Sequence, residues 1–61
     1  MCLSTVVNEK KETLAKNVAY VTTVDGKLVF TDIMGIPLSV NAEIEKIDLM
    51  ENLIYIRQES K

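Results

Sequence analysis

Residues 18–32, VAYVTTV-DG-KLVFTD, contain the strongest local structural signal in the sequence. Two runs rich in β-branched and aromatic residues flank the Asp25-Gly26 dipeptide. Asp-Gly favours a two-residue type I′ hairpin, because both central positions of that turn need a positive φ. The turn fixes the register across the two predicted strands. The predicted pairs are Val24 with Lys27, Thr23 with Leu28, Val21 with Phe30 and Ala19 with Asp32.

Side chains alternate between the two faces of a strand, so this register sorts the hairpin into two sets. The face that includes Phe30 is predicted to form the main core. It gathers Ala19, Val21, Leu28 and Phe30. The opposite face is apolar enough to predict a second contact, with either a barrel wall or another subunit. It carries Tyr20, Thr22, Val24, Val29 and Thr31.

Further strands are predicted on both sides of this hairpin. The run from Cys2 to Val7 is rich in β-branched residues and predicts a first strand, followed by a charged, solvated loop at 8–12. Residues 13–16 predict a short second strand, with Asn17 as a bend or bulge. After a turn in which Gly35 is free to take a positive φ, residues 36–40 predict another strand. Pro37 lacks an N–H, so that strand belongs at a sheet edge or begins at a bulge.

A second hairpin is predicted from residues 44–50 and 53–58, around Glu51 and Asn52. A two-residue loop gathers the aliphatic side chains on one face, which favours this register. Its pairs are Leu49 with Ile54 and Ile47 with Ile56. Glu51 would be mildly strained at a positive φ, so a longer loop stays open. A helix from Ala42 to Met50, capped by Asn41, is a further alternative for the first of these strands.

Six short strands and tight turns in 61 residues predict an all-β fold, a small SH3-like barrel of about five to six short antiparallel strands. We expect one small β domain over residues 1–61. A chain this short buries only about 60% of the surface that its unfolded form exposes. A metal ion or an oligomer is therefore a plausible source of added stability.

Composition excludes several functional classes. Seven Lys and Arg against nine Asp and Glu give a net charge of −2, and nucleic-acid binders need clustered basic residues. No apolar run approaches the roughly 20 residues of a membrane span, and no signal-peptide core follows Met1. A single cysteine fits a reducing compartment. We therefore expect a cytoplasmic protein with no membrane partner, and the charge balance disfavours a nucleic-acid partner.

The chain is poor in catalytic groups. It has no His, so it cannot form a Ser-His or Cys-His pair, and enzymatic activity is not expected. Asp32 before a turn and Glu43 and Glu45 on a strand edge are interpreted as structural or solvated carboxylates. Met34 and Met50 are interpreted as core or interface filler.

Cys2 is the residue whose position changes its chemistry. Its thiolate and a neighbouring amine or backbone amide nitrogen can form a chelate with one metal ion. Such mixed N and S donors suit Ni(II) or Cu(II) better than a tetrahedral Zn(II) site. One chain offers few donors, so two termini meeting in a dimer could complete the set. On the residues alone, an inert cysteine at the start of a strand is the simpler interpretation.

Several stretches together resemble the CooT family of small nickel-binding accessory proteins. They are the opening MCLSTV, residues 18–27, LVFTDIMG at 28–35 and IEKIDL at 44–49. The resemblance implies a compact β fold and a Ni(II) site at Cys2. It also implies a role in maturation of nickel-dependent carbon monoxide dehydrogenase, with that enzyme or its maturation proteins as partners. For some members it implies a homodimer.

Related sequences have also been catalogued as RNA-binding, which gives an alternative function. A small barrel could act as an RNA-binding or protein adaptor module, although fold alone does not set function. RNA binding would require basic side chains to converge on one face with an aromatic such as Tyr20. The candidate basic residues are Lys10, Lys11, Lys16 and Lys27.

Overall fold

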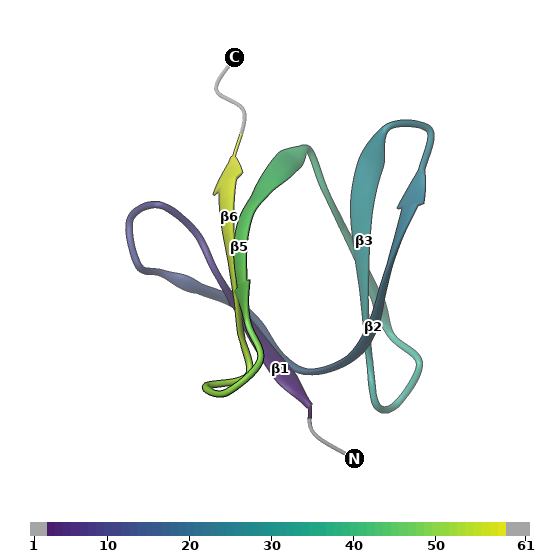
Figure 1. Ribbon diagram of the computed structural model, residues 1–61. Coiled ribbons are helices and arrows are strands. Elements are labelled where there is room, and N and C mark those ends of the chain that lie inside the picture. The colour runs from purple at the N-terminus through teal and green to yellow at the C-terminus, as the bar shows by residue number, and fades with distance from the viewer. Residues whose placement is uncertain (1–2, 59–61) are drawn as a thin grey trace.

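The computed structural model describes residues 3–58 and folds them into one six-stranded sheet (Figure 1). The strands are β1 (Ser4–Val7), β2 (Thr13–Val24), β3 (Lys27–Asp32), β4 (Pro37–Val40), β5 (Ala42–Asp48) and β6 (Leu53–Gln58). Residues 3–58 contain no helix, so the all-β prediction is confirmed. Cys2, the predicted start of the first strand, lies outside the described residues.

The sheet is curved but not closed. Its order is β4-β3-β2-β1-β6-β5, which leaves β4 and β5 as the two edges. Pro37 begins an edge strand, as predicted. The pairing of β1 with β6 is parallel, which departs from the expected antiparallel barrel. Parallel neighbours need a long connection, and here the whole segment from β2 to β5 joins the two strands.

The central hairpin forms as the sequence predicts. Asp25 has a φ of 53° and Gly26 a φ of 80°, the two positive values that a type I′ turn requires. Val24 pairs with Lys27 and Val21 pairs with Phe30. The local chemistry of the turn therefore fixes this half of the sheet.

β2 is irregular around Asn17 and Ala19. Asn17 has a φ of 57°, and the pairing with β1 shifts here, between Ala15 and Val18. The pairing with β3 shifts separately, between Val18 and Tyr20. Val18 rather than Ala19 pairs with Asp32, so the predicted Ala19 pair is wrong. The side chain of Val18 is buried and that of Ala19 is exposed. An extra residue bends a strand without ending it. The two strands predicted over residues 13–16 and 18–24 therefore form one long bent strand.

The second hairpin also differs from its predicted register. Residues 42–48 form a strand and not a helix. The loop spans residues 49–52 and has four residues, which is the longer alternative, and Asn52 takes the positive φ of 57°. Asn tolerates that conformation better than Glu51 would. The observed pairs are Asp48 with Leu53, Ile47 with Ile54 and Ile44 with Ile56.

The core lies on the concave face of the curved sheet. Val6, Phe30 and Ile56 are each no more than 1% exposed and come from three different strands. This confirms the Phe30 face of the central hairpin as the core face. Tyr20 and Val24 on the opposite face are 59% and 54% exposed, so no barrel wall within residues 3–58 covers them.

The charged loop after β1 is organised by a buried Asn8. Its Oδ1 accepts hydrogen bonds from the N–H groups of Lys10 and Glu12, each at 2.9 Å. Its Nδ2 donates to the side chains of Glu12 and Gln58. The pKa of Glu9 is lowered, because its carboxylate accepts the backbone N–H of its own residue and that of Gln58. The loop is therefore tied to the end of β6.

The bulge generates a test of the fold. Replacing Asn17 with Val should lower the free energy of unfolding by about 1–2 kcal/mol, because a β-branched residue is strained at a positive φ. Asn17→Gly should leave stability near that of the wild type. Thr22→Val, at an exposed position of regular strand, is the control. Urea unfolding of the three variants measures the differences, and wild-type stability of Asn17→Val would contradict the assigned bulge.

Candidate functional site

The start of β1 is held inside the sheet, between β2 and β6. Ser4 pairs with Val18 on one side. On the other side the N–H of Thr5 donates to the carbonyl oxygen of Asn52 at 2.9 Å. Leu3, the residue that follows Cys2 in the sequence, is half-buried. Cys2 itself, the predicted metal ligand, lies outside the described residues.

Two turns leave the sheet at the level where β1 starts. Cross-strand pairs form one row across five strands, through Asp32, Val18, Ser4, Thr5, Leu53 and Asp48. With about 4.8 Å between neighbouring strands, β3 and β6 lie roughly 14 Å apart along this row. Figure 1 shows the start of β1 between the two turns, at one end of the sheet. We call this end, made of Leu3, Ser4 and the turns 33–36 and 49–52, the N-terminal rim.

The two turns are built in the same way. Oδ1 of Asp32 accepts the N–H groups of Met34 and Ile36, each at 2.9 Å. Oδ1 of Asp48 accepts the N–H of Met50 at 3.1 Å and that of Glu51 at 3.0 Å. An aspartate that bonds the backbone two residues later is an Asx turn. Asp32 therefore has a structural role, as the sequence indicated.

These turns expose apolar side chains. The exposed fractions are 60% for Ile33, 80% for Met34, 60% for Ile36, 79% for Leu49 and 93% for Met50. Met34 and Met50 were interpreted as core or interface filler. Their exposure shows that core filler is wrong. The signal that could have identified this surface is the repeated Asp-aliphatic-Met, at residues 32–34 and 48–50. A gathering of large apolar groups at one end of a molecule marks a contact surface.

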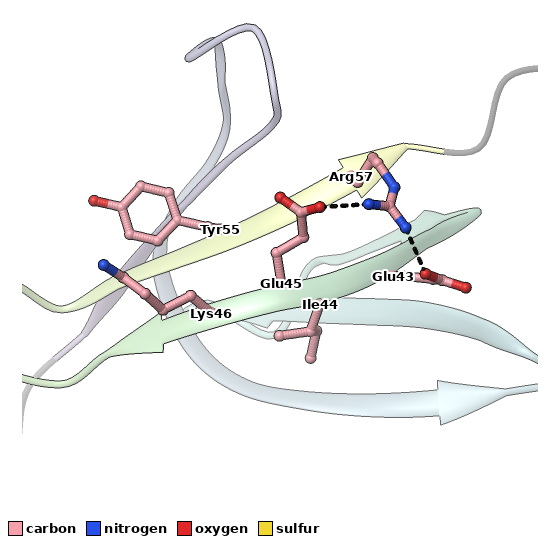
Figure 2. A pocket seen from close by; sticks show the side chains of 6 residues that line it. All are labelled: Glu43, Ile44, Glu45, Lys46, Tyr55 and Arg57. Atoms are coloured by element: carbon pink, nitrogen blue, oxygen red, sulfur yellow. Dashed lines mark hydrogen bonds and ion pairs between the residues drawn. The ribbon is translucent and has the colours of Figure 1, made fainter.

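A polar hollow of about 630 Å³ lies on the outer side of the β5–β6 hairpin (Figure 2). Arg57 bridges Glu43 at 3.0 Å and Glu45 at 2.6 Å. Lys46 lies with its Nζ 5.1 Å from the centroid of the Tyr55 ring. Exposed ion pairs of this kind contribute about 0–1 kcal/mol each. Both cations are already engaged, so the hollow is a solvated surface network, as the sequence indicated for the two glutamates.

The lysines considered for RNA binding do not gather on one face. Lys10 and Lys11 belong to the loop after β1, whereas Lys27 starts β3 at the tip of the central hairpin. Figure 1 shows that loop and that hairpin tip on opposite sides of the molecule. Lys16 lies in β2, so the four candidate lysines come from three separate parts of the fold.

Metal-ligating side chains are scattered through the described part of the chain. Within residues 3–58, no group of three or more His, Cys, Asp and Glu side chains could hold an ion. The same residues include no helix that is long and apolar enough to cross a membrane.

Comparisons with known proteins identify the family. The sequence model described as CO dehydrogenase accessory protein CooT matches residues 1–57. Among curated proteins, none matches this chain. A crystal structure of a protein provisionally assigned as CooT, from Carboxydothermus hydrogenoformans, superposes with a TM-score of 0.87 at 19% identity. The superposition covers 97% of this chain and 100% of that one, and it shows a shared fold. From the family match, this chain belongs to the CooT family of CO dehydrogenase accessory proteins.

Proposed function

We propose that the chain is a cytoplasmic, non-enzymatic Ni(II)-binding protein that serves the maturation of nickel-dependent carbon monoxide dehydrogenase. Cys2 is its metal ligand. The observation that carries the proposal is the CooT family match, which spans residues 1–57 and so includes Cys2. Nickel enters as cargo for the enzyme and not as part of the fold.

The chemistry of the chain supports Cys2 as the ligand. It is the only cysteine, and the chain has no His. A thiolate with a neighbouring amine or amide nitrogen gives the mixed N and S donors that suit Ni(II). This donor set is small. Positions left open on the ion can be taken by a second chain or by the recipient protein, which suits a carrier that must release its metal.

The fold supports the same assignment. β1 has neighbours on both sides: Ser4 pairs with Val18 of β2, and Thr5 pairs with Leu53 of β6. Chain ends usually fray unless they are tied into a sheet in this way. A ligand next to Leu3 in the sequence therefore adjoins an anchored strand.

Titration with Ni(II) tests the ligand. Wild-type protein should develop thiolate-to-nickel charge-transfer absorption, because a Ni–S bond forms, and Cys2→Ser should not. The matched control is Cys2→Ser combined with Ser39→Cys, which moves the single thiol to an exposed position on β4. We expect that control to bind at least tenfold more weakly than the wild type. Equal binding by wild type and Cys2→Ser would remove the site assignment.

Nickel affinity should also depend on pH. A thiol with an ordinary pKa of about 8.5 must lose its proton to bind, so binding releases protons. Affinity should therefore fall by about tenfold for each pH unit below neutrality when one proton is released. Competition with a chelator of known pH dependence, repeated from pH 6 to 8 (roughly the range in which thiols begin to ionise), measures the slope. A flat profile would argue against thiolate ligation.

A nickel-dependent homodimer follows from the small donor set. The sequence predicted a second contact for the outer face of the central hairpin. Tyr20 and Val24 on this face are exposed, so another subunit could supply that contact. Native mass spectrometry with Ni(II) should show two chains sharing one ion, and the metal-free sample should show fewer dimers. One nickel ion on a monomer would contradict a shared site. Whether Cys2 binds that ion would still be decided by the absorption titration.

A further inference from the structure

The N-terminal rim gathers exposed apolar residues from two turns at one end of the sheet. Its five exposed aliphatic and Met side chains come from two turns that leave the sheet at the same row. Single exposed apolar residues are ordinary, but a contiguous group marks a binding surface. The rim lies on either side of the start of β1.

A groove adjoins the rim at Ile36. It has a volume of about 270 Å³ and reaches the core side chains Val18 and Phe30. Its walls are mostly apolar and include Leu14, Ala15, Ile36, Pro37 and Leu38. A groove that is concave and largely apolar, with few polar groups at its margin, suits an aliphatic side chain. It gives the rim a place to anchor a partner.

The turns present their side chains on fixed backbone. Each Asp carboxylate accepts two backbone N–H groups, so the turn is ordered before anything binds. Pre-ordered surfaces lose less conformational entropy on association. The Met side chains remain adaptable, because their unbranched thioethers fit many apolar shapes.

Charge around the rim is mainly acidic. The sequence has no Lys or Arg in residues 28–45 or in residues 47–56. The charged residues of the two turns and their first strand neighbours are Asp32, Asp48 and Glu51. Lys16 stands at one margin, beside Asp32 in the lining of the groove. Complementary potential across an interface steers partners and sets specificity, so this rim favours basic flanks on its partner.

Strand addition at the sheet edges is a less suitable way to dock. β4 has only four residues and begins with Pro37. β5 carries an irregularity between Ile44 and Lys46 and the charged side chains of Glu43 and Glu45. Proline, short length, bulges and charges are the features that protect edge strands from pairing. The apolar surface at the turns has no such protection.

We propose that the N-terminal rim docks a partner protein through a segment that carries large aliphatic side chains flanked by Lys or Arg. One aliphatic side chain occupies the groove beside Ile36, and the others cover Met34, Leu49 and Met50. A partner docked in this way contacts the chain next to Leu3. The docking needs no metal, so it can be tested on metal-free protein and does not depend on the proposed nickel site.

The test uses NMR spectra of the reduced, metal-free, ¹⁵N-labelled chain. Three synthetic amphipathic peptides of equal length serve as probes: one of Leu and Lys, one of Leu and Glu, and one of Ser and Lys. The Leu and Lys peptide should shift the amide signals of Ile33, Met34, Leu49 and Met50. It should bind at least tenfold more tightly than either of the other two, because only it matches both the apolar groups and the acidic margin.

Variants separate the rim from the rest of the surface. Met34→Ser with Met50→Ser should weaken binding of the Leu and Lys peptide by tenfold or more. Both side chains are at least 80% exposed, so the fold should persist, as the unperturbed spectrum will verify. Val24→Ser, an exposed apolar position on the central hairpin, is the matched control and should bind as the wild type does. Glu51→Lys should weaken the Leu and Lys peptide and strengthen the Leu and Glu peptide.

Four outcomes would overturn the proposal. They are shifts confined to other residues, equal binding of the Leu and Lys and Leu and Glu peptides, and undiminished binding by the double Met variant. The fourth is a dependence of the rim signals on protein concentration without peptide, which would make a second copy the occupant. The nickel titration reports on Cys2 alone. Either proposal can therefore fail without affecting the other.

Discussion

The positive φ of Asn17 is the constraint on which the sheet depends. It lies in the middle of β2, at the shift in register against β1 and close to the shift against β3 between Val18 and Tyr20. An extra residue increases the local bend and twist of a strand. One long strand can therefore pair with β1 along its first half and with β3 along its second half. The resulting curvature brings Val6, Phe30 and Ile56 together on the concave face.

The same curvature determines where the start of β1 lies. β1 becomes an interior strand, although it is the first in the sequence. Its start is bonded to Asn52 at the end of one Asp-led turn, and Asn17 accepts the N–H of Ile33 in the other. The first described residues therefore lie between two apolar turns at one end of the sheet. A metal ligand at Cys2 and a docking surface at the N-terminal rim would be neighbours, which fits a protein that passes an ion to a partner.

Local chemistry in the sequence predicts the parts of the fold that depend on neighbouring residues. Asp25-Gly26 determines its hairpin, and Pro37 correctly indicates an edge. The register at Ala19 could not be predicted, because the irregularity between Val18 and Tyr20 depends on how β2 pairs with two strands at once. The Leu49 pairing failed because a face of aliphatic residues fits two registers equally well. The family resemblance is the source of the Cys2 prediction, which stays a prediction. The rim was missed because exposure of Met34 and Met50 depends on where the turns leave the sheet.

Ligation of nickel by the Cys2 thiolate is the central claim, and nickel K-edge X-ray absorption tests it most directly. The spectrum reports the elements bonded to the ion, so a sulfur ligand is distinguished from nitrogen and oxygen. We predict a sulfur scatterer with nitrogen or oxygen neighbours in the wild-type protein loaded with Ni(II). In Cys2→Ser the sulfur scatterer should be absent. A wild-type spectrum with only nitrogen and oxygen neighbours would contradict the account.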